Sequence, residues 1–101
     1  MNVYKISIDD NAKKDIREAK FYYNKINPLL KDKFLNDLYD SVNLLKSNPH
    51  YQVRYRQIHC LPLNKFPFML HFSINEAESK VIIWAVISTH RNPSTTWVFK
   101  S

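Results

Sequence analysis

The apolar residues of this 101-residue chain change their spacing once, and that change indicates the class of fold. In residues 12–45 they recur every three or four positions, which is the period of a helix with one buried face. Between residues 53 and 87 the period becomes two, which is typical of β-strands. A helical first half and a stranded second half predict an α+β domain in which the helices cover one face of a sheet.

Two helices are expected between residues 9 and 48. Asp9 and the two polar residues after it can cap a helix start, and the proline after Asn27 ends one helix while suiting the first turn of the next. The proline after Asn48 ends the second helix in the same way. Because the link is short, we expect an antiparallel hairpin. The predicted buried positions are Ala12, Ile16, Ala19, Tyr23 and Ile26 in the first helix, and Leu30, Phe34, Leu38, Val42 and Leu45 in the second.

Strand periodicity occurs in residues 3–8, 51–58, 66–74 and 81–87. The second of these stretches would place Arg54 and Arg56 on the same side of one strand, roughly 7 Å apart. A loop containing Cys60 and Pro62 is expected after it. Residues 75–79 read as a hairpin loop, in which Asn75 is the residue best suited to a positive φ.

The run 81–87 is apolar on both faces, which predicts the most buried strand. Residues 1–101 are therefore expected to form a single α+β domain. It consists of an N-terminal strand and a two-helix antiparallel hairpin packed on one face of a small twisted antiparallel sheet of three to five strands.

The chain contains no glycine, and this excludes several kinds of site. Walker A and dinucleotide-binding loops need glycine at fixed positions, so no nucleotide cofactor of that type is expected. The single cysteine, Cys60, can form neither an internal disulfide nor a metal knuckle, and we expect no metal or other cofactor. No apolar run is long enough to span a membrane, and the N-terminus lacks a secretory signal. These features predict a soluble, cytoplasmic protein without membrane contact.

Positive charge gathers in the second half of the chain. Fifteen Lys and Arg stand against nine Asp and Glu, giving a net charge of +6. Between Asp40 and Glu76 no carboxylate occurs, whereas Arg54, Arg56 and Lys65 do. A surface built from these residues attracts nucleic acid or an acidic protein partner. The alternative is a solvated basic face without a partner.

A series of short motifs covers nearly the whole chain. They are Ala12-x-x-Asp15-Ile16, Tyr22-Tyr23, Phe34-Leu35, Asn48-Pro49, the basic strand around Arg54 and Arg56, Phe66-Pro67-Phe68, the Val81 to Ile87 run, and His90-Arg91-Asn92-Pro93. In this order they resemble the RelE/ParE superfamily of bacterial toxins from type II toxin-antitoxin systems. The resemblance implies two helices on a small twisted sheet, inhibition of bacterial growth, and neutralisation by a cognate antitoxin that wraps the toxin.

The superfamily divides by target. RelE-like members cut messenger RNA in the ribosomal A site without metal, and ParE-like members act on DNA gyrase. Metal-free RNA cleavage needs a base, an acid and cations that stabilise the developing charge. His90 or His71 can exchange a proton near neutral pH. The candidate catalytic residues are Arg56, Arg91 and His90, and the candidate phosphate- or target-binding residues are Arg54 and Lys65.

The chain departs from the RelE-like pattern at its C-terminal end. RelE-like enzymes often use a tyrosine there, but all six tyrosines lie at or before Tyr55, and Trp97 occupies that region. The Tyr22-Tyr23 and Phe66-Pro67-Phe68 motifs also look closer to the ParE-like branch. Ribosome-dependent messenger RNA cleavage and non-enzymatic inhibition of DNA gyrase both stay open. A non-toxic basic adaptor domain that binds RNA or an acidic peptide is the third hypothesis.

Overall fold

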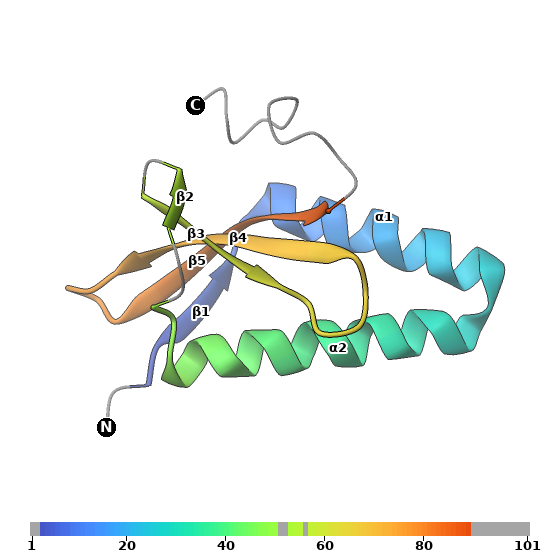
Figure 1. Ribbon diagram of the computed structural model, residues 1–101, viewed down its shortest axis with the longest axis horizontal. Coiled ribbons are helices and arrows are strands. Elements are labelled where there is room, and N and C mark those ends of the chain that lie inside the picture. The colour runs from blue at the N-terminus through green and yellow to red at the C-terminus, as the bar shows by residue number, and fades with distance from the viewer. Residues whose placement is uncertain (1–2, 51–52, 56, 90–101) are drawn as a thin grey trace.

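Two helices pack against a five-stranded sheet in the computed structural model, which describes residues 3–50, 53–55 and 57–89 (Figure 1). The elements follow the order β1 (Lys5–Ile8), α1 (Asp10–Ile26), α2 (Pro28–Ser47), β2 (Val53–Tyr55), β3 (Ile58–Pro62), β4 (Phe68–Asn75) and β5 (Lys80–Ser88). The strand order is β1-β5-β4-β3-β2. Strands β2 to β5 pair antiparallel, and β1 joins β5 in parallel. The expected α+β class and helical hairpin are confirmed, and the sheet is mixed rather than wholly antiparallel, because β1 runs parallel to β5.

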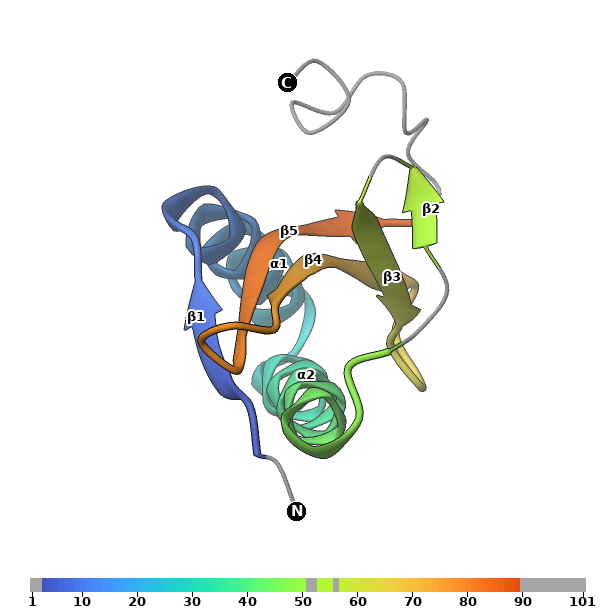
Figure 2. The same cartoon turned by 90° about the vertical axis from the view of Figure 1, so that its left-hand side faces the viewer.

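The helix boundaries lie at the predicted capping residues. The Asp9 carboxylate accepts the Asn11 backbone N–H at 3.0 Å at the start of α1. Asn27 ends α1, and its side-chain oxygen accepts the Leu29 N–H at 2.9 Å, which caps the start of α2. Because one residue serves both helices, the turn between them is tight. Figure 2 shows α2 below the curved sheet and α1 beside β5.

The core lies between α2 and the strands β4 and β5. Phe34 of α2 and Phe72 of β4 are fully buried, and Leu45 and Ile83 are buried with them. The ring of Tyr23 packs near Phe34, with 5.5 Å between ring centroids. Ile26, in contrast, is 58% exposed, so its predicted burial is wrong. The reason is geometric, because the helical hairpin extends past the ends of the strands (Figure 1).

The segment expected as one strand over residues 51–58 is instead two strands. Tyr55 of β2 pairs with Ile58 of β3, and the strands run antiparallel, so the chain reverses between them. Cys60 and Pro62 consequently lie in β3 and not in a loop. Proline has no backbone N–H to donate to a neighbouring strand. It is tolerated at position 62 because the described part of β2 pairs with β3 only as far as His59.

The β4–β5 turn forms where it was expected, but the roles of its residues differ from the prediction. Ser79 has the positive φ, 50°, that was predicted for Asn75. The Asn75 side-chain oxygen instead accepts the Glu78 N–H at 3.1 Å. Asn75 therefore stabilises the turn through its side chain rather than through a left-handed backbone.

Strand β5 lies between β1 and β4, which agrees with its apolar sequence. The register shifts between His71 and Phe72, which pair with Ala85 and Ile83, so Trp84 is the extra residue of a β-bulge. Beyond the bulge, Ala85 and Ile87 pack in a small second cluster with Ile58, away from the main core. The bulge therefore changes which positions of β5 face the main core, from Val81 and Ile83 before it to Val86 after it, and both faces of the strand pack against apolar groups.

A buried carboxylate fixes the β3–β4 loop to α2. Asp37 is 4% exposed and accepts three backbone N–H groups, from Asn64 at 3.2 Å, Lys65 at 2.8 Å and Phe66 at 2.9 Å. A carboxylate accepting several N–H bonds is well compensated for its burial. The position of this loop on the helical layer therefore depends on Asp37.

Replacing Asp37 with alanine should lower the free energy of unfolding by about 2–4 kcal/mol, because three N–H groups lose a charged acceptor. Urea denaturation followed by circular dichroism measures this change. Asp40→Ala, at an exposed position of the same helix, is the matched control and should alter stability by less than about 0.5 kcal/mol. Equal effects of the two variants would show that the Asp37 bonds contribute little.

Candidate functional site

The structure places two of the five predicted site residues. Lys65 lies exposed in the loop between β3 and β4, and the backbone of Arg54 lies in β2. Arg56, His90, Arg91 and the side chain of Arg54 lie outside the described residues. Arg54 belongs to the strand that pairs with the start of β3, whereas Lys65 follows its end. These two residues are therefore separated by the length of β3, and the grouping of the basic residues stays a prediction.

The three histidines in the described part of the chain all pack against neighbouring side chains. His71 is 6% exposed, and its Nδ1 lies 3.6 Å from Cys60 Sγ across the β3–β4 pair. The His59 ring stacks on Phe72 at 5.5 Å between centroids. His50 lies beside Glu76. His71, one of the residues proposed to exchange a proton, is thus held inside the sheet and away from bulk solvent.

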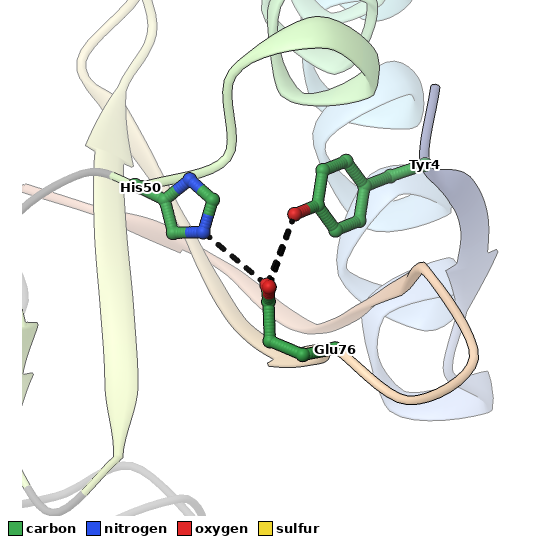
Figure 3. A network of polar contacts seen from close by, with 3 residues as sticks. All are labelled: Tyr4, His50 and Glu76. Atoms are coloured by element: carbon green, nitrogen blue, oxygen red, sulfur yellow. Dashed lines mark hydrogen bonds and ion pairs between the residues drawn. The ribbon is translucent and has the colours of Figure 1, made fainter. Parts of the chain in front are cut away.

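A polar network missed by sequence reasoning joins three distant parts of the chain (Figure 3). The Tyr4 hydroxyl donates to Glu76, at 3.0 Å from Oε1, and His50 Nε2 lies 3.2 Å from the same oxygen. The Tyr4 and His50 rings also meet edge to face at 6.0 Å. The network ties the start of β1 and the segment after α2 to the β4–β5 turn. The one sign of this network in the sequence is Glu76, which is the first carboxylate after Asp40.

Burial raises the pKa of Tyr4 above its usual value of 10.0, and the hydrogen bond to Glu76 and the negative charge of Glu76 add to this effect. Burial also raises the pKa of Tyr23, and the negative charge that the neighbouring Tyr22 can carry raises it further. A raised pKa means that the folded protein keeps these protons at a pH where the unfolded chain releases them. The contribution of the two tyrosines to stability is complete below about pH 10 and is lost as the pH rises above it.

A second feature missed from sequence is a groove beside α1. The Asp15 carboxylate accepts the Val86 N–H at 3.0 Å, beyond the last β1–β5 pair, Ile8 with Ile83. Asp15 thereby satisfies a backbone donor of β5 where β1 no longer runs beside it. The groove has a volume of about 180 Å³ and is lined by Asp15, Glu18, Ala19, Tyr22, Phe68, Val86 and Ser88. Two carboxylates in a groove of a basic protein can receive a cationic side chain.

No helix among the described residues is long and apolar enough to cross a membrane. Within the same ranges, no three histidine, cysteine or carboxylate side chains gather as metal ligands would.

The raised pKa values of Tyr4 and Tyr23 predict that the free energy of unfolding falls as the pH rises above about 10. In the Tyr4→Phe/Tyr23→Phe double variant this alkaline decline should be shallower, because neither group has a proton to lose. Urea denaturation across this pH range tests it, with Tyr39→Phe, an exposed tyrosine, as the control. Parallel alkaline curves for the double variant and the control would contradict the assignment.

Comparison with solved structures supports the fold. The chain is similar to the chromosomal ParDE toxin-antitoxin system from P. aeruginosa, at 18% identity and a TM-score of 0.72, covering 85% of this chain and 96% of that one. It is also similar to the RelBE2 toxin-antitoxin complex from Mycobacterium tuberculosis, at 14% identity and a TM-score of 0.56, over 85% and 98% of the two chains. The intact E. coli RelBE complex matches at 16% identity and a TM-score of 0.53, over 87% and 99%.

No curated protein matches the sequence significantly. A family model does match, and it covers residues 6–93, which includes every helix and almost all of every strand described above. The model is described as the ParE toxin of the type II toxin-antitoxin system parDE. The chain therefore belongs to the ParE toxin family of type II toxin-antitoxin systems.

Proposed function

We propose that the protein inhibits bacterial growth by acting on DNA gyrase, without catalysing a reaction, and that a cognate antitoxin neutralises it. The observation that carries this proposal is the ParE family match over residues 6–93. The TM-score of 0.72 to a ParDE system, against 0.56 and 0.53 to RelBE complexes, favours the same branch. The solved relatives include toxin-antitoxin complexes, which supports an antitoxin as the partner.

The inventory of proton-transfer groups also favours a non-enzymatic toxin. No tyrosine occurs after Tyr55, so the C-terminal part of the chain lacks the group that RelE-like enzymes often use there. His71 is buried against Cys60, and His59 stacks on Phe72. A general acid or base must reach the reacting atoms. In the described part of the chain, these two histidines are packed in the sheet rather than presented to a substrate.

Ribosome-dependent cleavage of messenger RNA is the second candidate, because the chain retains the cations that such cleavage needs. Arg54, Arg56, Lys65 and Arg91 are available to bind phosphate, and His90 is available for proton transfer. Lys65 is the one of these whose side chain the structure describes, and it is exposed. Under this candidate Arg56, Arg91 and His90 act on RNA; under the first, the arginines bind the protein target or its DNA.

Purified protein should block DNA supercoiling by gyrase in vitro, and messages in arrested cells should stay intact. Supercoiling assays and mapping of message 5′ ends from the same induced culture separate the two candidates. Normal supercoiling at a large molar excess of the protein, together with messages cut within translated codons, would contradict the gyrase proposal. That result would identify the ribosome as the target.

The variants Arg56→Ala and Arg91→Ala should each reduce growth arrest at least tenfold, measured as surviving colonies after induction, because each removes a cation from the predicted anion-binding surface. Their melting temperatures should stay within about 2 °C of the wild-type value, since neither residue belongs to an apolar stripe. Lys33→Ala, which removes an exposed lysine of α2, is the charge-matched control and should arrest growth normally. A large drop in melting temperature would mean that the two arginines are structural.

A further inference from the structure

The outer face of α1 is a ridge of positive charge. Ala12 and Ala19 are buried and mark the side of the helix that faces the core. At about 100° per residue, the opposite side of the helix carries Phe21 and four exposed cations. We call this set of residues the α1 ridge, and its cations are Lys13, Lys14, Arg17 and Lys25. Within the arc from Lys13 to Lys25, Asp10 is the one carboxylate of α1, so four cations stand against one acid.

Little of this charge is neutralised inside the protein. Lys13 Nζ lies 4.0 Å from Asp10 Oδ1, and both side chains are exposed, so this ion pair is weak. Lys14 and Arg17 make no ion pair within the part of the chain that the structure describes. The carboxylate of Glu18 belongs to the groove side of α1. The ridge therefore retains a positive potential that is available to an anionic partner.

An aromatic ring forms the crest of the ridge. Phe21 is 64% exposed, and the Lys25 ammonium lies 4.9 Å from its ring centroid. By helical spacing, Lys13 and Arg17 lie on one side of this ring. Lys14 and Lys25 lie on its other side. The ridge thus combines an apolar crest with a cationic flank on each side.

The dimensions of the ridge fit duplex DNA. From Lys14 to Lys25 it spans eleven residue steps, or about 16 Å of helix. Duplex DNA carries one phosphate charge per about 1.7 Å of its axis, so cations along such a length find phosphates in any register. Its major groove, about 12 Å wide, admits an α-helix and has a phosphate strand along each side. A convex ridge with cations on both flanks is complementary to that shape.

We propose that the α1 ridge binds duplex DNA in the major groove, with its cations on the two phosphate strands and Phe21 toward the base edges. An apolar side chain in this groove contacts the methyl group of thymine. The phosphate contacts carry most of the affinity, so binding has little sequence preference and weakens steeply with salt. The inference goes beyond the proposed function, since it assigns a direct ligand to the helix whichever target the toxin inhibits.

The test uses the full chain and a short fluorescein-labelled DNA duplex, with affinity measured by fluorescence anisotropy over a series of salt concentrations. The slope of log affinity against log salt should be about −3 to −4, because each neutralised phosphate contributes about −0.9. The double variant Lys14→Glu/Arg17→Glu should bind at least tenfold more weakly, with a slope shallower by about 2. Lys33→Glu/Lys46→Glu changes two exposed lysines of α2 and shifts the net charge equally. It should bind within threefold of the wild type, and circular dichroism confirms that both variants are folded.

A second variant examines the crest separately from the charges. Phe21→Ala should lower the affinity two- to fivefold and leave the salt slope unchanged, because it removes an apolar contact and no cation. Tyr39→Ala, which removes an exposed aromatic ring of α2, is the control and should leave the affinity unchanged. An RNA duplex of the same sequence should bind at least fivefold more weakly than the DNA, since its major groove is too deep and narrow for side chains to read.

Three results would overturn the proposal. Equal losses of affinity in the two double variants would show that net charge alone attracts DNA. Equal affinity for the DNA and RNA duplexes would exclude seating in the major groove. Binding to phosphatidylglycerol vesicles without binding to DNA would make the ridge a lipid-binding surface. Gyrase inhibition is measured separately, so normal supercoiling with DNA binding through the ridge would remove the proposed function and leave this inference in place.

Discussion

Burial of the apolar stripe of α2 against β4 and β5 is the contact on which the rest of the structure depends. Phe34 and Leu45 from the helix and Phe72 and Ile83 from the strands are excluded from solvent together. Each such side chain stabilises the fold by about 1.5–3 kcal/mol when buried. In this chain without glycine, side chains help to stabilise several of the turns, as Asn27 and Asn75 do. Asp37 accordingly attaches the β3–β4 loop to the same helix through three backbone bonds.

The same layering determines which surfaces remain for partners. The helices cover one face of the sheet, and their tip extends past the strands, which leaves Ile26 exposed (Figure 1). Strand β1 pairs with β5 only as far as Ile83, so the second half of β5 faces α1 across a groove. Among the described residues, the exposure of Ile26 and the groove between α1 and β5 are thus consequences of a short β1 and a long α1.

The sequence predicted those parts of the fold that depend only on residues close together in the chain. The capping oxygens of Asp9 and Asn27 mark the helix starts correctly, because capping depends on neighbouring residues. The reversal between Tyr55 and Ile58 was missed, since period two continues through β2 and β3 without a glycine turn signal. The Tyr4–His50–Glu76 network and the Asp15–Val86 bond join residues far apart in sequence, and no spacing rule anticipates them. Of the candidate site, Lys65 lies exposed in the loop between β3 and β4, and the clustering of the arginines stays a prediction.

The central claim is that this ParE-family chain is an active toxin controlled by a partner. Conditional expression in growing bacteria, with and without a cognate antitoxin, tests that claim most directly. The account predicts that the chain alone stops colony formation and that co-expression restores it. Unimpaired growth during strong expression of soluble, folded protein would contradict the account and would favour a non-toxic adaptor domain instead.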